Sequence, residues 1–235
     1  KDMATRNLLV QLNERGLITL PPRRRPAAKR RTSAGGLNNR LVPLPMTEPL
    51  ATLMPLQIEI MNVGHPERAT FSQYIVRFHY LGYRGCVGEN IFYRVRDRTG
   101  RDLACVLFSA AAWKTHPRDF FIGWDPATRA RHLAFVTNNT RFLILPWVHV
   151  PHLASHLLGL LVRRLSSDWQ EKYNHPVYLV ETFVERDRFK GTCYRAANWI
   201  CVGQTQGRSR NDRYSTLSVP IKDIYLYPLT PHFHE

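Results

Sequence analysis

Residues 176–207 read PVYLVETFVERDRFKGTCYRAANWICVGQTQG. An apolar, β-branched run over residues 177–184 is interrupted by Glu181, and a short helix-like segment follows it. A second strand-like run then ends in the turn 203–207, so the segment predicts a strand, a helix and a strand. Polar side chains stand in this unit where packing alone favours apolar ones, and such misfits are common at functional sites. They are Glu181, Thr182, Cys193, Tyr194 and Asn198.

The flanking segments extend this unit into one α/β domain over residues 46–235. Strands are predicted at 56–62, 90–96, 102–108, 141–147 and 221–227, and helices at 66–80, 125–138 and 151–169. The tetrapeptide DRTG at 97–100 is typical of a hairpin turn, and the aromatic-rich stretch 113–124 is predicted to be a loop. The order predicts a mixed sheet flanked by helices.

Length and composition set the class of protein. The chain has 235 residues, 44% of them hydrophobic, which suffices for one substantial core and a small appendage. No apolar stretch approaches the roughly 18 residues that span a bilayer, and no secretory leader is visible. The four cysteines lack CxxC spacing, which favours reduced thiols over zinc ligands or disulfides. We expect a cytoplasmic protein with no membrane partner.

Charge is the strongest compositional signal. Lysine and arginine outnumber aspartate and glutamate by 33 to 18, which leaves a net charge of +15. Such an excess attracts polyanions, and nucleic acid, DNA above all, is the expected partner. Three arginines that follow the final turn of the opening segment are expected to contact phosphates: Arg208, Arg210 and Arg213.

The first 45 residues are expected to form a separate basic module. A helix over about residues 4–15, Gly16, a short strand at 17–20 and two prolines resemble the end of a winged helix. A basic run follows, and a disordered arm over residues 23–39 is the alternative interpretation. Either form would bind the phosphate backbone. The residues concerned are Arg23, Arg24, Arg25, Lys29, Arg30 and Arg31.

The order of elements resembles that of the GCN5-related N-acetyltransferases. In that family, backbone amides at the helix that follows the central strand hold the pyrophosphate of acyl-CoA. The resemblance implies acyl-CoA as a cofactor, but the corresponding segment here, VHVPHLASH at 148–156, lacks the family's Gly-rich loop. It also implies Tyr194 as a general acid and Glu181 as a base. A core tyrosine with a satisfied hydroxyl is the alternative for Tyr194.

Individual motifs resemble the DruA family of the Druantia anti-phage system, which is also related to transposase-like bacterial proteins. The motifs are HYLGYRGCVGEN at 79–90, RDFFIGW at 118–124, NNTRFLILPWVHVPHLASHLLG at 138–159, DWQEKYNHPVYLVETFV at 168–184 and RFKGTCYRAANWICVGQTQGR at 188–208. The resemblance implies a bacterial protein of phage defence or mobile DNA, acting with other defence proteins. It supplies no catalytic assignment.

Further side chains are candidates for a cleft or for phosphate binding. His79, as a catalytic group, is expected to line a cleft, although a histidine that caps a helix end is the alternative. The other cleft and stacking candidates are Tyr80, Glu89, Trp113, Asp119, Trp124, Asn139, Cys193 and Asn198. The helix start at His152, Ser155 and His156 is a phosphate-binding candidate. A metal site is not predicted there, because the glutamate of an HExxH motif is replaced.

Three functions remain open. The first, which the sequence favours, is a DNA-binding protein of a defence or mobile-element system. The second is a nucleic-acid-modifying enzyme whose acyltransferase-like core uses Glu181 and Tyr194, with His79, on a base drawn from the stack. The third is a metal-dependent enzyme that nicks DNA or takes part in transposition. That alternative requires Glu89, Asp119 and Glu181 to meet at a metal.

Overall fold

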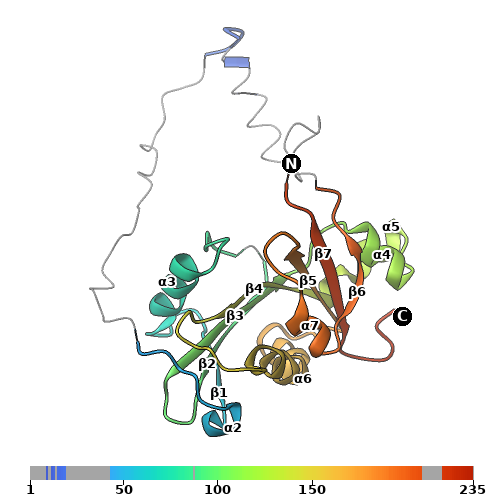
Figure 1. Ribbon diagram of the computed structural model, residues 1–235. Coiled ribbons are helices and arrows are strands. Elements are labelled where there is room, and N and C mark those ends of the chain that lie inside the picture. Colours follow the sequence, from blue (N-terminus) through green and yellow to red (C-terminus); the bar gives the residue numbers. More distant parts are fainter. Residues whose placement is uncertain are drawn as a thin grey trace. The chain divides into compact units, whose positions relative to one another are not determined.

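The computed structural model describes residues 9, 12–13, 15–19, 43–86, 88–207 and 219–234. It divides the chain into two units, Lys1–Val42 and Pro43–Glu235, and the second contains the sheet (Figure 1). Residues 17–19 of the predicted winged-helix strand form no regular secondary structure, and most of the helix predicted for that module lies outside the described residues. So do the basic residues predicted to bind phosphate, which are Arg23, Arg24, Arg25, Lys29, Arg30, Arg31, Arg208, Arg210 and Arg213.

The second unit alternates strands and helices along the chain. In order, the elements are α2 Leu50–Leu53, β1 Gln57–Ile60, α3 Arg68–Phe78, β2 Asn90–Arg96, β3 Asp102–Ala110, α4 His116–Ile122, α5 Pro126–His132, η1 Leu133–Phe135, β4 Val136–Ile144, α6 Leu153–Tyr173, β5 Leu179–Glu185, α7 Thr192–Ala196, β6 Ile200–Gln204 and β7 Lys222–Pro228.

The described strands form one seven-stranded sheet in the order β1-β2-β3-β4-β5-β7-β6. Neighbouring strands are antiparallel except for the central pair, β4 and β5, which run parallel. Strand β7 lies between β5 and β6, so the two strands of segment 176–207 do not pair with each other. The predicted mixed α/β sheet with flanking helices is confirmed.

Helices cover both faces of this sheet. The long helix α6 packs Leu158, Leu161 and Leu165 into one apolar cluster with alternate residues of β2 and β3, such as Val106. The side chains of α3, including Phe71, belong to a second cluster with the intervening strand residues. Each buried leucine contributes about 1.5–3 kcal/mol, so these two layers hold the central strands in place from both sides.

Two sequence predictions of secondary structure were wrong. Residues 113–124 are not all loop, because α4 forms within them, with Pro117 in its first turn and left-handed Gly123 at its C-terminal cap. The helix predicted at 125–138 ends at His132. The chain then enters β4 at Val136, because residues from Thr137 onward pair with β3 and the start of the strand also pairs with β5. Pairing on both sides overrides the helical spacing of the apolar residues.

Among the described helices, none is both long and apolar enough to cross a membrane.

Candidate functional site

The two central parallel strands pair over a short distance and then separate. Their register joins Val136 to Leu179, Thr137 to Val180 and Asn138 to Glu181, and it stops there although both strands continue. A β-bulge coincides with the separation, since β3 pairs with Asn139 and Arg141 but not with Thr140. Bulges end strand pairing and redirect side chains, often beside active sites. The separation leaves a gap in the middle of the sheet.

A cavity of about 530 Å³ lies at this separation, within the usual range for small-molecule sites. We call it the split cavity. Both separating strands, the end of α3, the start of α6 and the β5–α7 connection line it. The lining residues are Phe78, His79, Tyr80, Leu81, Asn139, Thr140, Phe142, Leu143, Ile144, Ala154, Thr182, Phe183, Val184, Phe189, Lys190, Gly191, Thr192, Cys193 and Tyr194.

A fixed hydrogen-bond arrangement lies at the point of separation. The hydroxyl of Tyr194 donates to Asn139 Oδ1 at 2.9 Å, and Asn139 Nδ2 donates to the carbonyls of Leu107 and Arg141 at 3.2 and 3.3 Å. Thr182 Oγ1 donates to the Asn139 carbonyl at 2.9 Å and so links the two strands beyond their last paired residues. Burial raises the pKa of Tyr194, which therefore keeps its proton at neutral pH.

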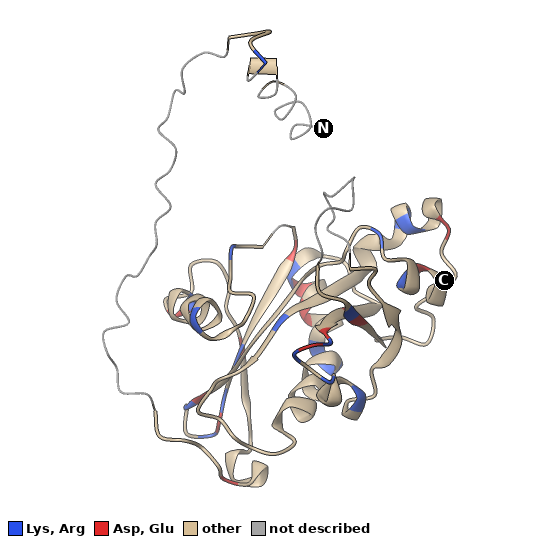
Figure 2. Cartoon of the chain, turned by 45° about the horizontal axis from the view of Figure 1, so that its top comes forward, with Lys and Arg blue, Asp and Glu red and all other residues tan. Residues whose placement is uncertain are grey.

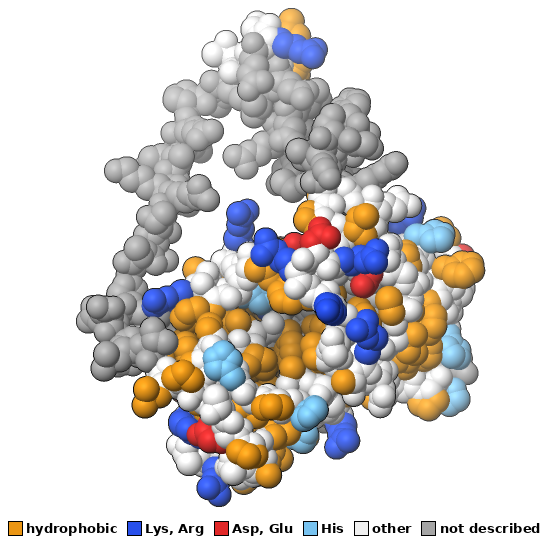
Figure 3. Space-filling model, viewed as in Figure 1, with side chains coloured by type: hydrophobic (Ala, Val, Ile, Leu, Met, Phe, Trp, Pro, Cys, Tyr) orange, Lys and Arg blue, Asp and Glu red, His pale blue; other side chains and the backbone are white. Residues whose placement is uncertain are grey.

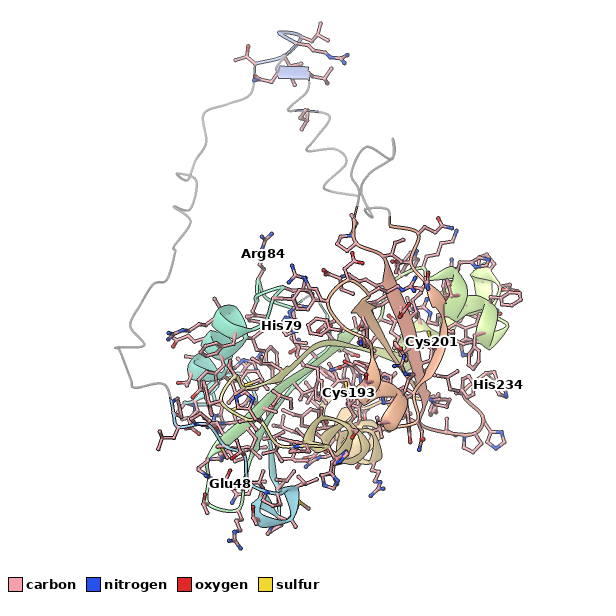
Figure 4. All side chains as sticks on the ribbon, in the orientation of Figure 1. Glu48, His79, Arg84, Cys193, Cys201 and His234 are labelled. Atoms are coloured by element: carbon pink, nitrogen blue, oxygen red, sulfur yellow. The ribbon has the colours of Figure 1, made fainter. Side chains whose placement is uncertain are left out.

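Two other candidates in the split cavity are also uncharged at neutral pH. His79, at the end of α3, accepts a hydrogen bond at Nδ1 from the Leu81 amide at 3.2 Å. Burial, and then the charge of Arg141, lower the pKa of His79 to about 4, so the ring is neutral and carries its proton on Nε2. Burial raises the pKa of the Cys193 thiol on α7. Figure 4 labels both side chains.

The rim of the split cavity is aromatic and basic. Tyr80, Leu81 and Phe189 line it while remaining 37%, 41% and 48% exposed. The ring centroids of Tyr80 and Phe189 are 5.3 Å apart, and the guanidinium of Arg188 lies 5.3 Å from the Tyr80 centroid. Lys190 follows on the same loop, in which basic and acidic residues alternate (Figure 2). On the face of the molecule that Figure 3 shows, Lys and Arg side chains lie beside an apolar middle.

A glycine shapes the entry to α7. Gly191 has a φ of +66°, and a Cβ there would overlap the hydroxyl and ring of Tyr225. The Tyr225 ring in turn stacks on Tyr194, with centroids 5.7 Å apart and planes at 25°. The chain therefore requires a residue without a side chain at this position in order to bring Tyr194 to the point of separation.

Glu181 does not share the cavity with Tyr194, contrary to the sequence prediction. Successive side chains of β5 alternate between the two faces, so Glu181 and Thr182 point opposite ways. Glu181 is fully buried, where Oε1 accepts from the Ala112 amide at 2.6 Å and Oε2 from Arg118 Nη1 at 2.8 Å. Burial raises the pKa of Glu181, and Arg118 opposes that rise. Both carboxylate oxygens are occupied by structural partners.

The other predicted acidic and aromatic residues also lie away from the split cavity. Glu89 binds Trp169 Nε1 at 3.2 Å and His175 Nε2 at 2.8 Å. Asp119 pairs with Arg118 and Arg129 on the face that carries Glu181. The remaining three are Trp113 in an exposed loop, Trp124 in a separate cavity of about 430 Å³, and Asn198, a left-handed turn residue with φ of 63°.

Several amides of the predicted phosphate-binding turn before α6 have acceptors within the protein. The amides of Val148, His149 and Leu153 donate to the carbonyls of Leu145, Met46 and Val150. His152 is an exposed left-handed cap, Ser155 Oγ donates to its carbonyl at 3.1 Å, and the Nε2 atom of His156 is buried without a partner. Of the first turn of α6, Ala154 reaches the split cavity. This turn lacks the glycines that let a backbone approach the pyrophosphate of acyl-CoA closely.

The described residues do not assemble a metal site. Among them, no three histidine, cysteine, aspartate or glutamate side chains gather closely enough to hold an ion. Glu89 lies with Trp169 and His175, whereas Asp119 and Glu181 are neutralised by Arg118. The carboxylates that a metal-dependent nicking enzyme would need are thus engaged in other contacts.

Comparison with known families identifies the chain. The family described as Druantia protein DruA matches residues 42–234. This chain belongs to the DruA family. The DruA match contains every element of the sheet and all the residues of the split cavity. The resemblance drawn from the sequence motifs is therefore confirmed.

Solved structures similar to the chain are acetyltransferases, the class whose order of elements the sequence resembles. A spermidine N-acetyltransferase from Vibrio cholerae, in complex with CoA and spermine, is 7% identical with a TM-score of 0.48, over 74% of this chain and 95% of that one. A putative acetyltransferase from Acinetobacter baylyi is 9% identical with a TM-score of 0.48, over 75% and 93% of the two chains. No curated protein matched the sequence.

Several residues of the split cavity were missed by sequence reasoning. Phe189 and Lys190 lie in the RFKG stretch, where an exposed aromatic between basic residues was the available signal. Thr140, in this cavity, and its neighbour Arg141 precede an apolar run, so the polar misfit rule that singled out Glu181 applied to them as well. Their position at the bulge depends on pairing with β3, which no local pattern encodes.

Proposed function

We propose that this protein binds nucleic acid and holds one nucleobase in the split cavity for a group-transfer reaction, as part of a bacterial anti-phage defence system. The observation that carries the proposal is the combination of an aromatic rim that includes basic residues with a cavity floor whose polar groups are uncharged. The DruA family membership supports the defence setting and partners drawn from the same system.

The rim suits a planar, sequence-tolerant ligand. Exposed aromatic side chains at a cavity mouth offer stacking surfaces, and base–aromatic stacking contributes about 1–3 kcal/mol per base. Tyr80 and Phe189 provide two such rings. Tyr80 also stacks on His79, with centroids 4.9 Å apart, and Arg188, which pairs with Glu185 at 2.7 Å, lies beside it. Because a base can enter a cavity of this kind only when it leaves the stack, single-stranded or locally opened nucleic acid is the expected form.

The charge of the site agrees with a polyanion. The lining of the split cavity contains no aspartate or glutamate among the described residues, and its charged member is Lys190. Arg188 stands on the same loop, and the whole chain carries a net charge of +15. Neutral bases flanked by phosphates match the cavity and its rim.

The chemistry that the cavity supports is hydrogen-bond and proton donation. Tyr194 retains its proton and donates a hydrogen bond to Asn139. If the hydroxyl turns from Asn139 toward the cavity, it can protonate a group that departs at the point of strand separation. His79 is neutral and offers an N–H rather than a lone pair at Nε2. These groups can orient a base and stabilise developing negative charge. Glu181 takes no part, because its carboxylate faces Arg118.

Binding of a fluorescein-labelled single-stranded DNA of about ten nucleotides tests this function. Tyr80→Ala and Phe189→Ala should each weaken binding by about tenfold. The matched control is Phe120→Ala, since Phe120 is 79% exposed on α4 and does not line the split cavity. Full-strength binding by both rim variants, or an equal loss in the control, would show that the cavity rim is not the nucleic-acid site.

A further inference from the structure

We infer that a second cavity, on the other side of the strand separation, binds a phosphate group and that Arg141 is its receptor. The inference rests on the proposed function, because the phosphate is expected to belong to the nucleotide whose base enters the split cavity. It adds a second binding site and gives the substrate a defined orientation across the sheet.

The second cavity, which we call the polar cavity, has a volume of about 310 Å³. It shares Leu81, Asn139, Thr140 and Phe183 with the split cavity, so the two spaces meet at the bulge. Its remaining lining is mostly polar and includes two cations. These residues are Asn138, Arg141, Thr205, Gly207, Val219, Pro220 and Lys222.

The bulge explains how one strand serves both cavities. Asn139 pairs with Phe108, whose side chain belongs to the apolar cluster under α6. Arg141 pairs with Leu107, which belongs to the cluster under α3. In a regular strand residues two apart face the same side, so the extra residue Thr140 turns Asn139 and Arg141 to opposite faces.

Arg141 is a half-buried cation without a carboxylate. Its Nε donates to the Gly82 carbonyl at 2.7 Å and its Nη1 to the Thr140 carbonyl at 2.6 Å, and no acidic side chain pairs with it among the described residues. Burial lowers the pKa of Arg141, yet a guanidinium remains charged at any physiological pH. Two carbonyls do not neutralise this charge, so an incoming anion is favoured.

Three other arginines, one in β2 and two in helices α4 and α6, differ in this respect. Each of three partly or fully buried arginines has a carboxylate within 2.9 Å. The pairs are Arg94 with Asp102 at 2.6 Å, Arg118 with Asp119 at 2.7 Å and Arg164 with Asp168 at 2.6 Å. Arg68 also lacks a carboxylate among the described residues, but its guanidinium lies over the Phe92 ring, 4.0 Å from the centroid. Arg141 thus differs from these three arginines, and it lines a cavity beside the candidate site.

Phosphate is the anion that fits these groups. A guanidinium fork can give two parallel hydrogen bonds to a phosphate, and Lys222 lines the same cavity as a second point charge. The source can be a backbone phosphate of the bound strand or a free phosphate-bearing ligand, since both present the same oxygens. A nucleotide across the bulge would place its phosphate at Arg141 and its base near Tyr194.

Methylphosphonate scanning of the same labelled oligonucleotide tests the inference. Each linkage in turn is made neutral, and affinities are measured for the wild type, Arg141→Gln, Lys222→Gln and the exposed control Arg163→Gln. At one linkage the wild type and the control should lose about tenfold in affinity. With the native linkage, Arg141→Gln should bind the oligonucleotide about tenfold more weakly than the wild type does. The neutral linkage at that position should then weaken its binding no further. Lys222→Gln leaves the contacts of Arg141 with the two carbonyls in place. Its affinity for the native oligonucleotide should therefore fall by less than that of Arg141→Gln.

A titration with inorganic phosphate distinguishes the two sources. If no linkage couples to Arg141, but phosphate raises the melting temperature of the wild type and not of Arg141→Gln, the site stands and its ligand is a free phosphate compound. The same phosphate result in a protein that binds no oligonucleotide would reject the proposed function and keep the anion site. Equal methylphosphonate losses in wild type and Arg141→Gln, together with equal phosphate effects, would overturn the inference.

Discussion

Glu181 and Thr182 are neighbours on β5, yet they belong to two very different regions. Glu181 is sealed in an ion-pair cluster in which both carboxylate oxygens are engaged. Thr182 faces the split cavity, where it holds the Asn139 carbonyl beside the Tyr194 hydroxyl. Both residues are polar interruptions of an apolar strand. A polar residue in an apolar strand therefore indicates a functional site when it borders a cavity. When it is fully enclosed, it indicates an ion pair or hydrogen bond that stabilises the fold.

The strongest test of this contrast is Glu181→Gln. It should lower the free energy of unfolding by about 3–5 kcal/mol, because it leaves the buried Arg118 guanidinium short of a counter-charge. Urea denaturation measures the loss. Replacement of both residues, Arg118→Met with Glu181→Met, should cost less than the sum of the single changes. Loss of oligonucleotide binding or phage protection in Glu181→Gln without loss of stability would instead place Glu181 in the functional region.

Gly191→Ala should cost about 1–3 kcal/mol of unfolding free energy. The new Cβ would overlap Tyr225, and the left-handed backbone at +66° disfavours a side chain. Thermal or urea unfolding detects the change. Gly159→Ala is the matched control, since a Cβ there meets nothing within 4 Å inside α6, and it should be neutral or stabilising. A neutral Gly191→Ala would mean that the approach to Tyr194 is not constrained in this way.

Tyr194→Phe should have a modest effect on stability and a large one on function. Loss of the hydroxyl leaves Asn139 Oδ1 without its donor, at a cost of about 1 kcal/mol. Oligonucleotide affinity should change by no more than about twofold, because the rim remains. Plaque counts in cells that carry the complete defence system should show protection lost. Normal protection by a folded Tyr194→Phe protein would remove the proton-donor role.

The smallest expected effect is a pH dependence due to His79. Its pKa in the folded state, about 4, lies below the ordinary histidine value of 6.5, so the unfolded chain binds more protons between these values. Stability that His79 contributes is therefore present above pH 6.5 and is lost as the pH falls toward 4. Urea unfolding should show that the free energy of unfolding falls less steeply with decreasing pH in His79→Gln than in the wild type. An identical decline in both proteins would contradict the neutral, donor form of His79.

The sequence predicted those parts of the fold that local patterns encode. The hairpin of β2 and β3 and the long helix α6 follow from turn chemistry and from apolar spacing, respectively. Strand β4 was placed too late, because Val136 continues a helical spacing of apolar residues and only pairing with β3 and β5 makes it a strand. Helix α4 was missed because its aromatic residues masked the signals of Pro117 and Gly123.

The candidate site was predicted as a set of residues rather than as an arrangement. Tyr194 and Asn139 were each singled out, but their hydrogen bond joins positions 55 residues apart, and no local pattern relates them. Glu181 was misinterpreted for the same reason, since its partner Arg118 lies 63 residues earlier. The side to which a polar residue turns follows from strand register, and register is a property of the assembled sheet.

Photo-crosslinking tests the central claim, that a nucleobase enters the split cavity, most directly. Single-stranded DNA that carries 5-iodouracil would be irradiated with the full-length protein, and the attached peptides identified by mass spectrometry. The account predicts cross-links at Tyr80 or Phe189, the exposed aromatic residues of the rim. Cross-links confined to aromatic residues outside the cavity, such as Trp113 or Phe120, would contradict it.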